Sequence, residues 1–264
     1  MNFIFLGTSA AVPSVARDTT SLVFVGDGGS ILVDCGGSPV QKLRRAGVDP
    51  LTLSHVVVTH MHPDHAYGLP ALIQNLRELG RVAPLGILCR HEHVDALRTL
   101  LSVFGLGKKS DLFPIEFTAA GDTTGAPGLV SGSLALSTGS SDHGRMPNLA
   151  VRVDVLANGT PSHAPRAVVY SSDTAPCRSV VELAKGADTL VHDATFPERD
   201  RGRSGGHSTP AEAGGIAEEA GVRRLILAHI DSDYHDELAA MASEARQRFR
   251  GIVEVAREFE PYSV

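Results

Sequence analysis

Apolar runs of strand length, separated by turn-forming residues, open the chain. Residues 2–6 and 21–25 are short and rich in β-forming residues, and residues 31–37 form a third run that ends in a glycine turn. These three runs predict an antiparallel meander. Residues 38–46 have helical periodicity, and residues 55–59 form a β-branched run with the length and composition of a buried strand.

Helical and extended patterns then alternate along the rest of the chain. Helices are predicted near residues 68–80 and 92–104. Extended runs predict strands near 84–89, 113–118, 133–138, 149–156, 166–171, 188–191 and 224–228. Residues 120–133 and 157–165 are rich in turn-forming residues and are predicted loops. Because no repeat or linker interrupts this mixture, the pattern predicts one α/β domain over residues 1–264.

Composition and charge narrow the class of protein. The 264 residues are 42% hydrophobic and 20% charged, which is typical of a globular enzyme with a real core. The net charge of −6 argues against a broadly basic surface, so any RNA binding must be local. Cys35, Cys89 and Cys177 fit reduced thiols in a cytoplasmic protein. We expect no membrane span, because no long apolar run is present.

Three imidazoles and a carboxylate gather within six residues directly after the predicted strand at 55–59. They are His60, His62, Asp64 and His65. Imidazole nitrogen and carboxylate oxygen are the ligands that catalytic zinc prefers. The two-residue spacing places His60 and His62 on one side of an extended chain, whereas Asp64 and His65 lie beyond the turn and can face a second metal. This cluster predicts a metal site; the alternative is a solvated histidine-rich loop.

Two metal ions need further ligands from distant parts of the chain. His143, Asp173 and His229 each follow a predicted strand, and each is of a ligand type. Any one of them alone is more often a structural or surface residue. Because all three residues share this placement at a strand end, we expect them to converge on the first cluster.

The order His-x-His-x-Asp-His, then His, Asp and His, resembles the metallo-β-lactamase superfamily over nearly the whole chain. The resemblance implies the fold of that family, an αββα four-layer sandwich with a two-metal site at one edge of two packed sheets. It implies two Zn²⁺, with Mn²⁺ or Fe²⁺ as substitutes. The implied ligands are His60, His62 and His143 for one ion, Asp64, His65 and His229 for the other, and Asp173 as the bridge.

Further motifs are similar to ribonuclease Z, the tRNA 3′-processing endonuclease. They are Phe5-Leu6-Gly7-Thr8-Ser9-Ala10-Ala11-Val12-Pro13, Asp34-Cys35-Gly36, and His192-Asp193-Ala194-Thr195-Phe196 followed by His207-Ser208-Thr209. In that family an acidic residue and a histidine from the last two motifs form a catalytic pair outside the metal shell. Here the resemblance implies Asp193 and His207. Relatives are commonly homodimers, so a homodimer is expected.

The resemblance implies a zinc-dependent phosphodiesterase with a metal-bridging hydroxide as nucleophile. Asp64 is a catalytic residue in this scheme because it holds a metal ion. His207, oriented and kept basic by Asp193, is the expected general acid for the leaving alkoxide. The alternative interpretation of His207 is an N-cap or loop histidine before a helix that begins near Pro210.

Departures from the family pattern leave the substrate open between a tRNA precursor and a small molecule. The interval between His143 and Asp173 holds two predicted strands and a turn, so the exosite arm of long-armed members does not fit there. Asp18 and Pro63 also depart from the usual motifs. The first alternative is therefore a small-molecule hydrolase that acts on a cyclic nucleotide, another phosphodiester or a sulfate ester. The second is a non-catalytic metal-binding scaffold.

Other polar segments support weaker interpretations. Residues 89–93, Cys-Arg-His-Glu-His, are expected to be a solvated helix start rather than a third metal site. His55, His163 and His235 have no evident partner, and His192 is expected to support a strand end. The charged loop at 197–206 is expected to be solvated, with a positive lip for an anionic substrate as the minority hypothesis.

Overall fold

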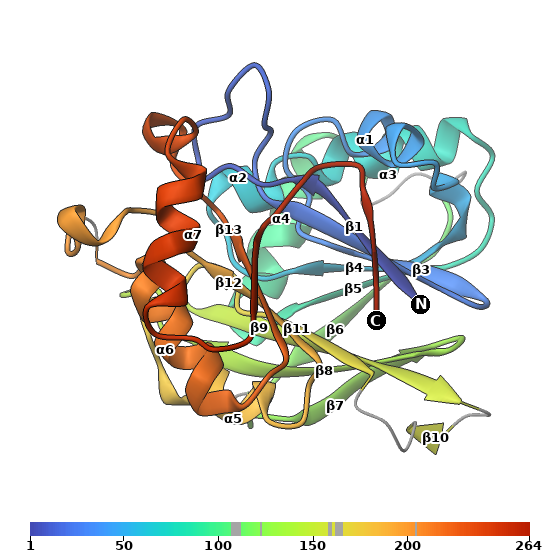
Figure 1. The fold of residues 1–264 in the computed structure, drawn as a ribbon. Coiled ribbons are helices and arrows are strands. Elements are labelled where there is room, and N and C mark those ends of the chain that lie inside the picture. The colour runs from blue at the N-terminus through green and yellow to red at the C-terminus, as the bar shows by residue number, and fades with distance from the viewer. Residues whose placement is uncertain (107–111, 122, 158–159, 162–165, 204) are drawn as a thin grey trace.

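Two mixed β-sheets packed face to face form the centre of the molecule, and helices cover both outer faces (Figure 1). The computed structural model describes residues 1–106, 112–121, 123–157, 160–161, 166–203 and 205–264. This arrangement confirms the predicted αββα sandwich. Most of the predicted loop at 157–165 lies outside the described residues. His163 lies outside them as well. Among the described helices, none combines the length and hydropathy needed to cross a membrane.

The first sheet has the strand order β15-β1-β2-β3-β4-β5-β6. Its strands are β1 (Asn2–Gly7), β2 (Ser21–Gly26), β3 (Gly29–Val33), β4 (Leu53–Val58), β5 (Leu85–Arg90), β6 (Ile115–Ala120) and β15 (Pro261–Ser263). Strands β1 to β3 pair antiparallel, which confirms the predicted meander. Strands β3 to β6 pair parallel. The apolar run of β4 is buried because the sheet is covered on both faces.

The second sheet has the order β14-β13-β12-β11-β9-β8-β7, with the short strand β10 paired to β9. Its strands are β7 (Ala126–Ser131), β8 (Leu134–Ser141), β9 (Asn148–Ala157), β10 (Thr160–Pro161), β11 (Ala167–Tyr170), β12 (Thr189–Asp193), β13 (Arg224–Ala228) and β14 (Ile252–Val255). Strands β11 to β14 are parallel, so their carboxyl ends lie at one edge of the sheet.

The prediction of a continuous loop over residues 120–133 is wrong. Strand β7 lies within it and pairs antiparallel with β8, and β6 extends to Ala120. Glycine and proline in this segment masked its strand character. Strand β7 is the edge strand of its sheet, and proline is tolerated in edge strands because one side of such a strand pairs with no neighbour.

Helices α1 (Pro39–Arg45), α2 (Pro63–Ala66), α3 (Leu69–Glu78) and α4 (Val94–Val103) lie over the first sheet (Figure 1). Helices α5 (Arg178–Ala184), α6 (Pro210–Ala220) and α7 (Leu238–Arg246) lie over the second. The predicted helix at 92–104 begins as a 3-10 turn before α4. Helix α6 begins at Pro210, as predicted. Its capping box joins Thr209 and Glu212, so Thr209 and not His207 is the N-cap.

Aromatic rings fill part of the space between the two sheets. Phe3 lies 5.8 Å from Phe24 and 5.2 Å from Tyr262 between ring centroids, and Phe3 also contacts Phe5. Phe3, Phe5 and Phe24 are fully buried. Because strand ends from both sheets supply the predicted metal ligands, this packing between sheets also sets the positions of those residues.

We predict that Phe24→Ala lowers the free energy of unfolding by about 3–5 kcal/mol, because it removes a fully buried ring and leaves a cavity. Chemical denaturation measures the change. Val82→Ala is the control, since Val82 is 84% exposed and its truncation is expected to cost less than about 0.5 kcal/mol. Equal losses in the two variants would contradict the prediction.

Candidate metal centre

Loops that follow four strands bring the seven predicted ligands together. His60 to His65 follow β4 and enter helix α2, and His143 follows β8. Asp173 follows β11, and His229 follows β13. Strand β4 belongs to the first sheet and the other three to the second, so the cluster lies where the edges of both sheets meet.

The first group consists of His60, His62, His143 and Asp173, whose candidate ligand atoms lie within 4.8 Å of one another. His62 Nδ1 lies 3.0 Å from His60 Nε2 and 3.0 Å from His143 Nε2. Asp173 Oδ2 lies 3.7 Å from His60 Nε2. Three imidazoles and one carboxylate therefore converge on one point.

The second group consists of Asp64, His65, Asp173 and His229, again within 4.8 Å. Asp64 Oδ2 lies 3.1 Å from His65 Nε2, and Asp173 Oδ2 lies 3.1 Å from His229 Nε2. Asp173 is the one residue that both groups share. This is the position that the resemblance gives to a bridging ligand.

The residues present fit divalent cations. His65 Nε2, His229 Nε2 and Asp173 Oδ1 are buried and make no hydrogen bond of good geometry, although His and Asp atoms face one another here at 3.1 to 3.4 Å. Each such atom costs about 1–3 kcal/mol unless something satisfies it. Imidazole nitrogens and carboxylate oxygens facing one another are the donor set of zinc, manganese and iron sites. Their roles as ligands stay a prediction.

Charge within the second group favours cations. Burial opposes protonation of His229, but Asp173 outweighs it and raises the pKa of His229 to about 10. Burial likewise opposes protonation of His65, and Asp173 and Asp34 raise its pKa well above the ordinary value. In the first group, burial lowers the pKa of His60 well below the ordinary value, and His65 adds to this effect. The buried carboxylates thus attract positive charge, which a bound cation supplies in place of protons.

Asp34, which had no predicted role, orients His65. Its carboxylate accepts bonds from His65 Nδ1 at 2.8 Å and from the Thr59 backbone N–H at 2.9 Å. Asp34, Ser172 and His229 all have left-handed backbones, with φ of 62°, 55° and 58°, a conformation that strains non-glycine residues. The motif Asp34-Cys35-Gly36 was the available signal. A Cβ on Gly36 would lie 2.0 Å from the Asp64 carbonyl oxygen, so glycine is required there.

Asp193 and His207 form a pair beside the cluster, with 2.7 Å between Asp193 Oδ2 and His207 Nδ1. Burial opposes ionisation of Asp193, but His207 lowers its pKa below the ordinary value. Burial opposes protonation of His207, and Asp193 outweighs it, so the pKa of His207 is raised. The His207 ring lies 4.8 Å from that of His143 and 5.2 Å from that of His229, between centroids. His207 therefore contacts both metal groups.

Asp193, His207 and His229 could themselves surround an ion, but hydrogen bonds already engage both oxygens of the Asp193 carboxylate. Oδ1 accepts bonds from Thr195 N and Thr195 Oγ1, and Oδ2 accepts bonds from Thr174 N and His207 Nδ1. A carboxylate with four such bonds has little capacity left for a cation. Asp193 is thus suited to orient His207.

The structure explains the two positions that depart from the ribonuclease Z pattern. Asp18 Oδ2 lies 3.2 Å from Nζ of the buried Lys42, so its carboxylate forms an ion pair with the buried ammonium group. Pro63 is the first residue of α2, where its fixed φ suits a helix start and no donor is missing.

The remaining polar segments do not join the site. In residues 89–93, Arg90 bonds Glu92, and His93 Nε2 donates to the carbonyl of Pro147. His192 is fully buried at the end of β12, as expected of a residue that supports the strand end. The arginines of the 197–206 loop pair with carboxylates: Arg199 with Glu237, Arg201 with Glu198, and Arg203 with Asp233. This pairing favours a solvated loop over a positive lip.

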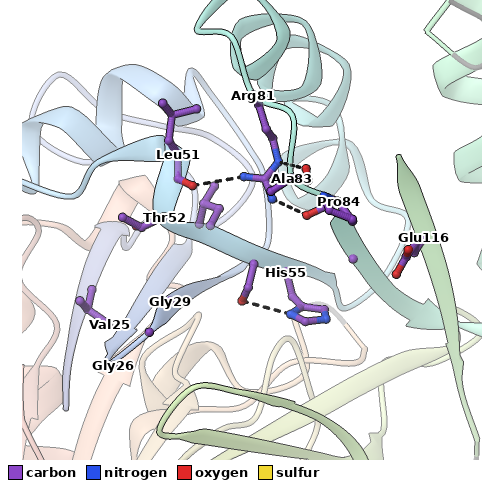
Figure 2. Close-up of a pocket in the computed structure, with 14 residues that line it drawn as sticks. Val25, Gly26, Gly29, Leu51, Thr52, His55, Arg81, Ala83, Pro84 and Glu116 are labelled. Atoms are coloured by element: carbon purple, nitrogen blue, oxygen red, sulfur yellow. Dashed lines mark hydrogen bonds between the residues drawn. The ribbon is translucent and has the colours of Figure 1, made fainter. Parts of the chain in front are cut away.

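A cavity of about 590 Å³ lies at the other end of the first sheet, by the amino ends of β4 and β5 (Figure 2). His55, Arg81 and Glu116 line it. The Arg81 guanidinium donates to the carbonyls of Leu51, Ala83 and Pro84 and so ties neighbouring loops together. None of the predicted site residues lines this cavity.

The fold and the residue cluster define a class of protein. The β-lactamase superfamily domain matches residues 30–230, a span that includes all seven candidate ligands and the Asp193–His207 pair. The chain is a metal-dependent hydrolase of this superfamily. Ribonuclease Z from Methanosarcina mazei is 31% identical, with 96% of this chain and 95% of the relative covered. The chain belongs to the ribonuclease Z family.

Solved structures agree on the fold. The metallo-β-lactamase fold protein YhfI from Bacillus subtilis superposes with a TM-score of 0.81 at 24% identity, covering 100% of this chain and 99% of that one. The short form of human tRNase Z superposes with a TM-score of 0.78 at 21% identity, with the same coverage. These likenesses confirm the sandwich architecture and no more.

We predict that Asp64→Ala binds at least one divalent ion fewer per chain than the wild type, because it removes a carboxylate from the second group. Elemental analysis after saturation and dialysis measures the stoichiometry. Asp233→Ala is the control, since that side chain is 66% exposed and lies outside the cluster. An unchanged metal content in Asp64→Ala would show that the ligand assignment is wrong.

Proposed function

We propose that this chain is a two-zinc phosphodiesterase that cleaves tRNA precursors at the 3′ end. The observation that carries the proposal is the Asp193–His207 pair in contact with both candidate metal groups. A nucleophile and a proton donor can then act on one phosphodiester from neighbouring positions. Relatives named ribonuclease Z, which match this chain over nearly its whole length, support RNA as the substrate.

Divalent ions, when bound, would supply a water of lowered pKa and electrostatic stabilisation of the charged phosphate oxygens. The protein residues supply orientation. Asp193 Oδ2 accepts a bond from His207 Nδ1, so Nε2 is the ring atom free to carry a proton to the leaving oxygen. The bonds from Thr174 N and Thr195 N hold Asp193 itself in place. His207 is thus positioned as the general acid.

We propose zinc as the metal in both groups because five of the seven ligands are imidazoles, with manganese or iron as substitutes. We also propose that residues 1–264 act as one domain and that the protein forms a homodimer in the cytoplasm. The free cysteines support the reducing compartment.

A small phosphodiester is the second candidate substrate. The described part of the interval between His143 and Asp173 contains the strands β9, β10 and β11. In long-armed members of the family, an inserted arm that grips tRNA lies in this interval. The interval in this chain is too short to hold such an arm. Hydrolysis of a cyclic nucleotide or another small diester needs no such arm.

We predict that His207→Ala lowers kcat about 10²- to 10⁴-fold on RNA, the range expected for loss of general acid catalysis, and keeps its metal content. The loss should be much smaller with bis(p-nitrophenyl) phosphate, because p-nitrophenolate leaves without protonation. Both substrates are assayed after elemental analysis. His91→Ala is the control, since that exposed histidine lies outside the site. Equal losses on both substrates, or none, would rule out the general-acid role.

We predict that the wild-type protein cleaves a 3′-extended tRNA precursor at the junction with its trailer. Gel analysis of a labelled precursor, with a matched mature tRNA as control, measures this activity. Turnover of small diesters without cleavage of the precursor would move the protein to the second candidate substrate. No turnover of either substrate with zinc or manganese would favour a non-catalytic scaffold.

A further inference from the structure

The hydroxyl of Thr195 lies among three side chains of the site. Its Oγ1 is 2.7 Å from Asp193 Oδ1, 3.0 Å from His229 Nδ1 and 3.1 Å from His207 Nδ1. Thr195, Asp193 and His229 are each no more than 3% exposed. Water therefore has little access to replace any of these contacts.

Counting protons gives the direction of each bond. A hydroxyl has one hydrogen, and the Thr195 hydroxyl donates it to Asp193 Oδ1. Its lone pairs can then only accept, so the bond to His229 requires the hydrogen on His229 Nδ1. His207 Nδ1 has its own acceptor in Asp193 Oδ2, at 2.7 Å. A reversed bond, with Thr195 donating to His229, would leave Asp193 Oδ1 without its shortest partner.

The position of the hydrogen on His229 determines which ring atom faces the second group. When a cation takes the place of the proton on Nε2, His229 keeps its hydrogen on Nδ1 and offers the lone pair of Nε2, which lies 3.1 Å from Asp173 Oδ2. The opposite tautomer would place a hydrogen on Nε2 and block it as a ligand. A hydrogen bond to the other ring nitrogen commonly orients metal-binding histidines in this way.

We propose that Thr195 is a positioning residue that links Asp193 to His229, so that one buried carboxylate orients both the proton donor and a metal ligand. Asp193 acts on His207 directly and on His229 through the Thr195 hydroxyl. The backbone keeps this link in register: Ala194 N donates to the carbonyl of Ala228, and Asp231 N donates to that of Thr195. Two backbone hydrogen bonds therefore join the loops after β12 and β13.

The inference rests on the proposed function, because it takes His229 as a ligand of the second group. Thr195→Val keeps the shape of the side chain and removes the hydroxyl. We expect the weaker-bound of two zinc ions to dissociate about 10- to 100-fold more readily, the usual effect of losing such a support. Thr195→Ser, which restores the hydroxyl, should recover most of the affinity. Competition with a chromophoric chelator measures both variants.

Controls separate this role from a general loss of stability. Thr189→Val removes a buried hydroxyl at the other end of β12, where Thr189 bonds Asp188, and should bind zinc as the wild type does. His207→Ala should also keep its zinc affinity, because His207 is not part of the link to His229. Thermal unfolding of each metal-free variant checks the fold, and Thr195→Ala provides a second measurement if the valine variant fails to fold.

The outcomes are distinguishable. Weaker zinc binding in Thr195→Val, restored in Thr195→Ser, supports the inference. Wild-type affinity in a folded Thr195→Val or Thr195→Ala variant overturns it while the proposed function stands. Wild-type stoichiometry in His229→Ala overturns it as well, and shows in addition that the ligand assignment behind the proposed function is wrong.

Discussion

Mutual attraction between one buried carboxylate and its surrounding histidines is the interaction on which the site depends. Asp173 is 2% exposed and belongs to both candidate metal groups. A buried carboxylate with an unsatisfied oxygen is costly unless positive charge lies beside it. Here that charge can come from protonated histidines or from divalent ions. The arrangement is therefore most stable when cations bind, which couples metal binding to the folded state.

Two further buried carboxylates lie beside this centre, and each orients a histidine side chain by accepting a hydrogen bond from it. Asp34 holds His65, and Asp193 holds His207 and, in our inference, His229. Backbone N–H groups fix both carboxylates: Thr59 N bonds Asp34, and Thr195 N bonds Asp193. Since these donors belong to the loops that end strands, the sheets set the positions of the carboxylates. The carboxylates in turn set the ring orientations of His65 and His207 on which the proposed metal binding and proton transfer depend.

The architecture explains how one site can serve different substrates within a family. The sheets and the packing between them position the candidate ligands, whereas surface ion pairs such as Arg199 with Glu237 hold the loops around them. Loop length can change without disturbing the sheets. Chemistry and substrate choice thus reside in different parts of the fold.

The sequence alone determined which residue types could bind metal, because ligand chemistry and strand-end placement are local properties of the chain. It also predicted most strands, although β7 escaped detection because glycine and proline weaken the extended pattern at an edge. The family resemblance in the sequence also gave Asp173 its place between the two groups. Only the tertiary structure decided that Asp34 supports His65 and that Thr195 joins Asp193 to His229. These contacts connect residues far apart in the chain, and their distances are set by the packing of two sheets, which no local pattern encodes.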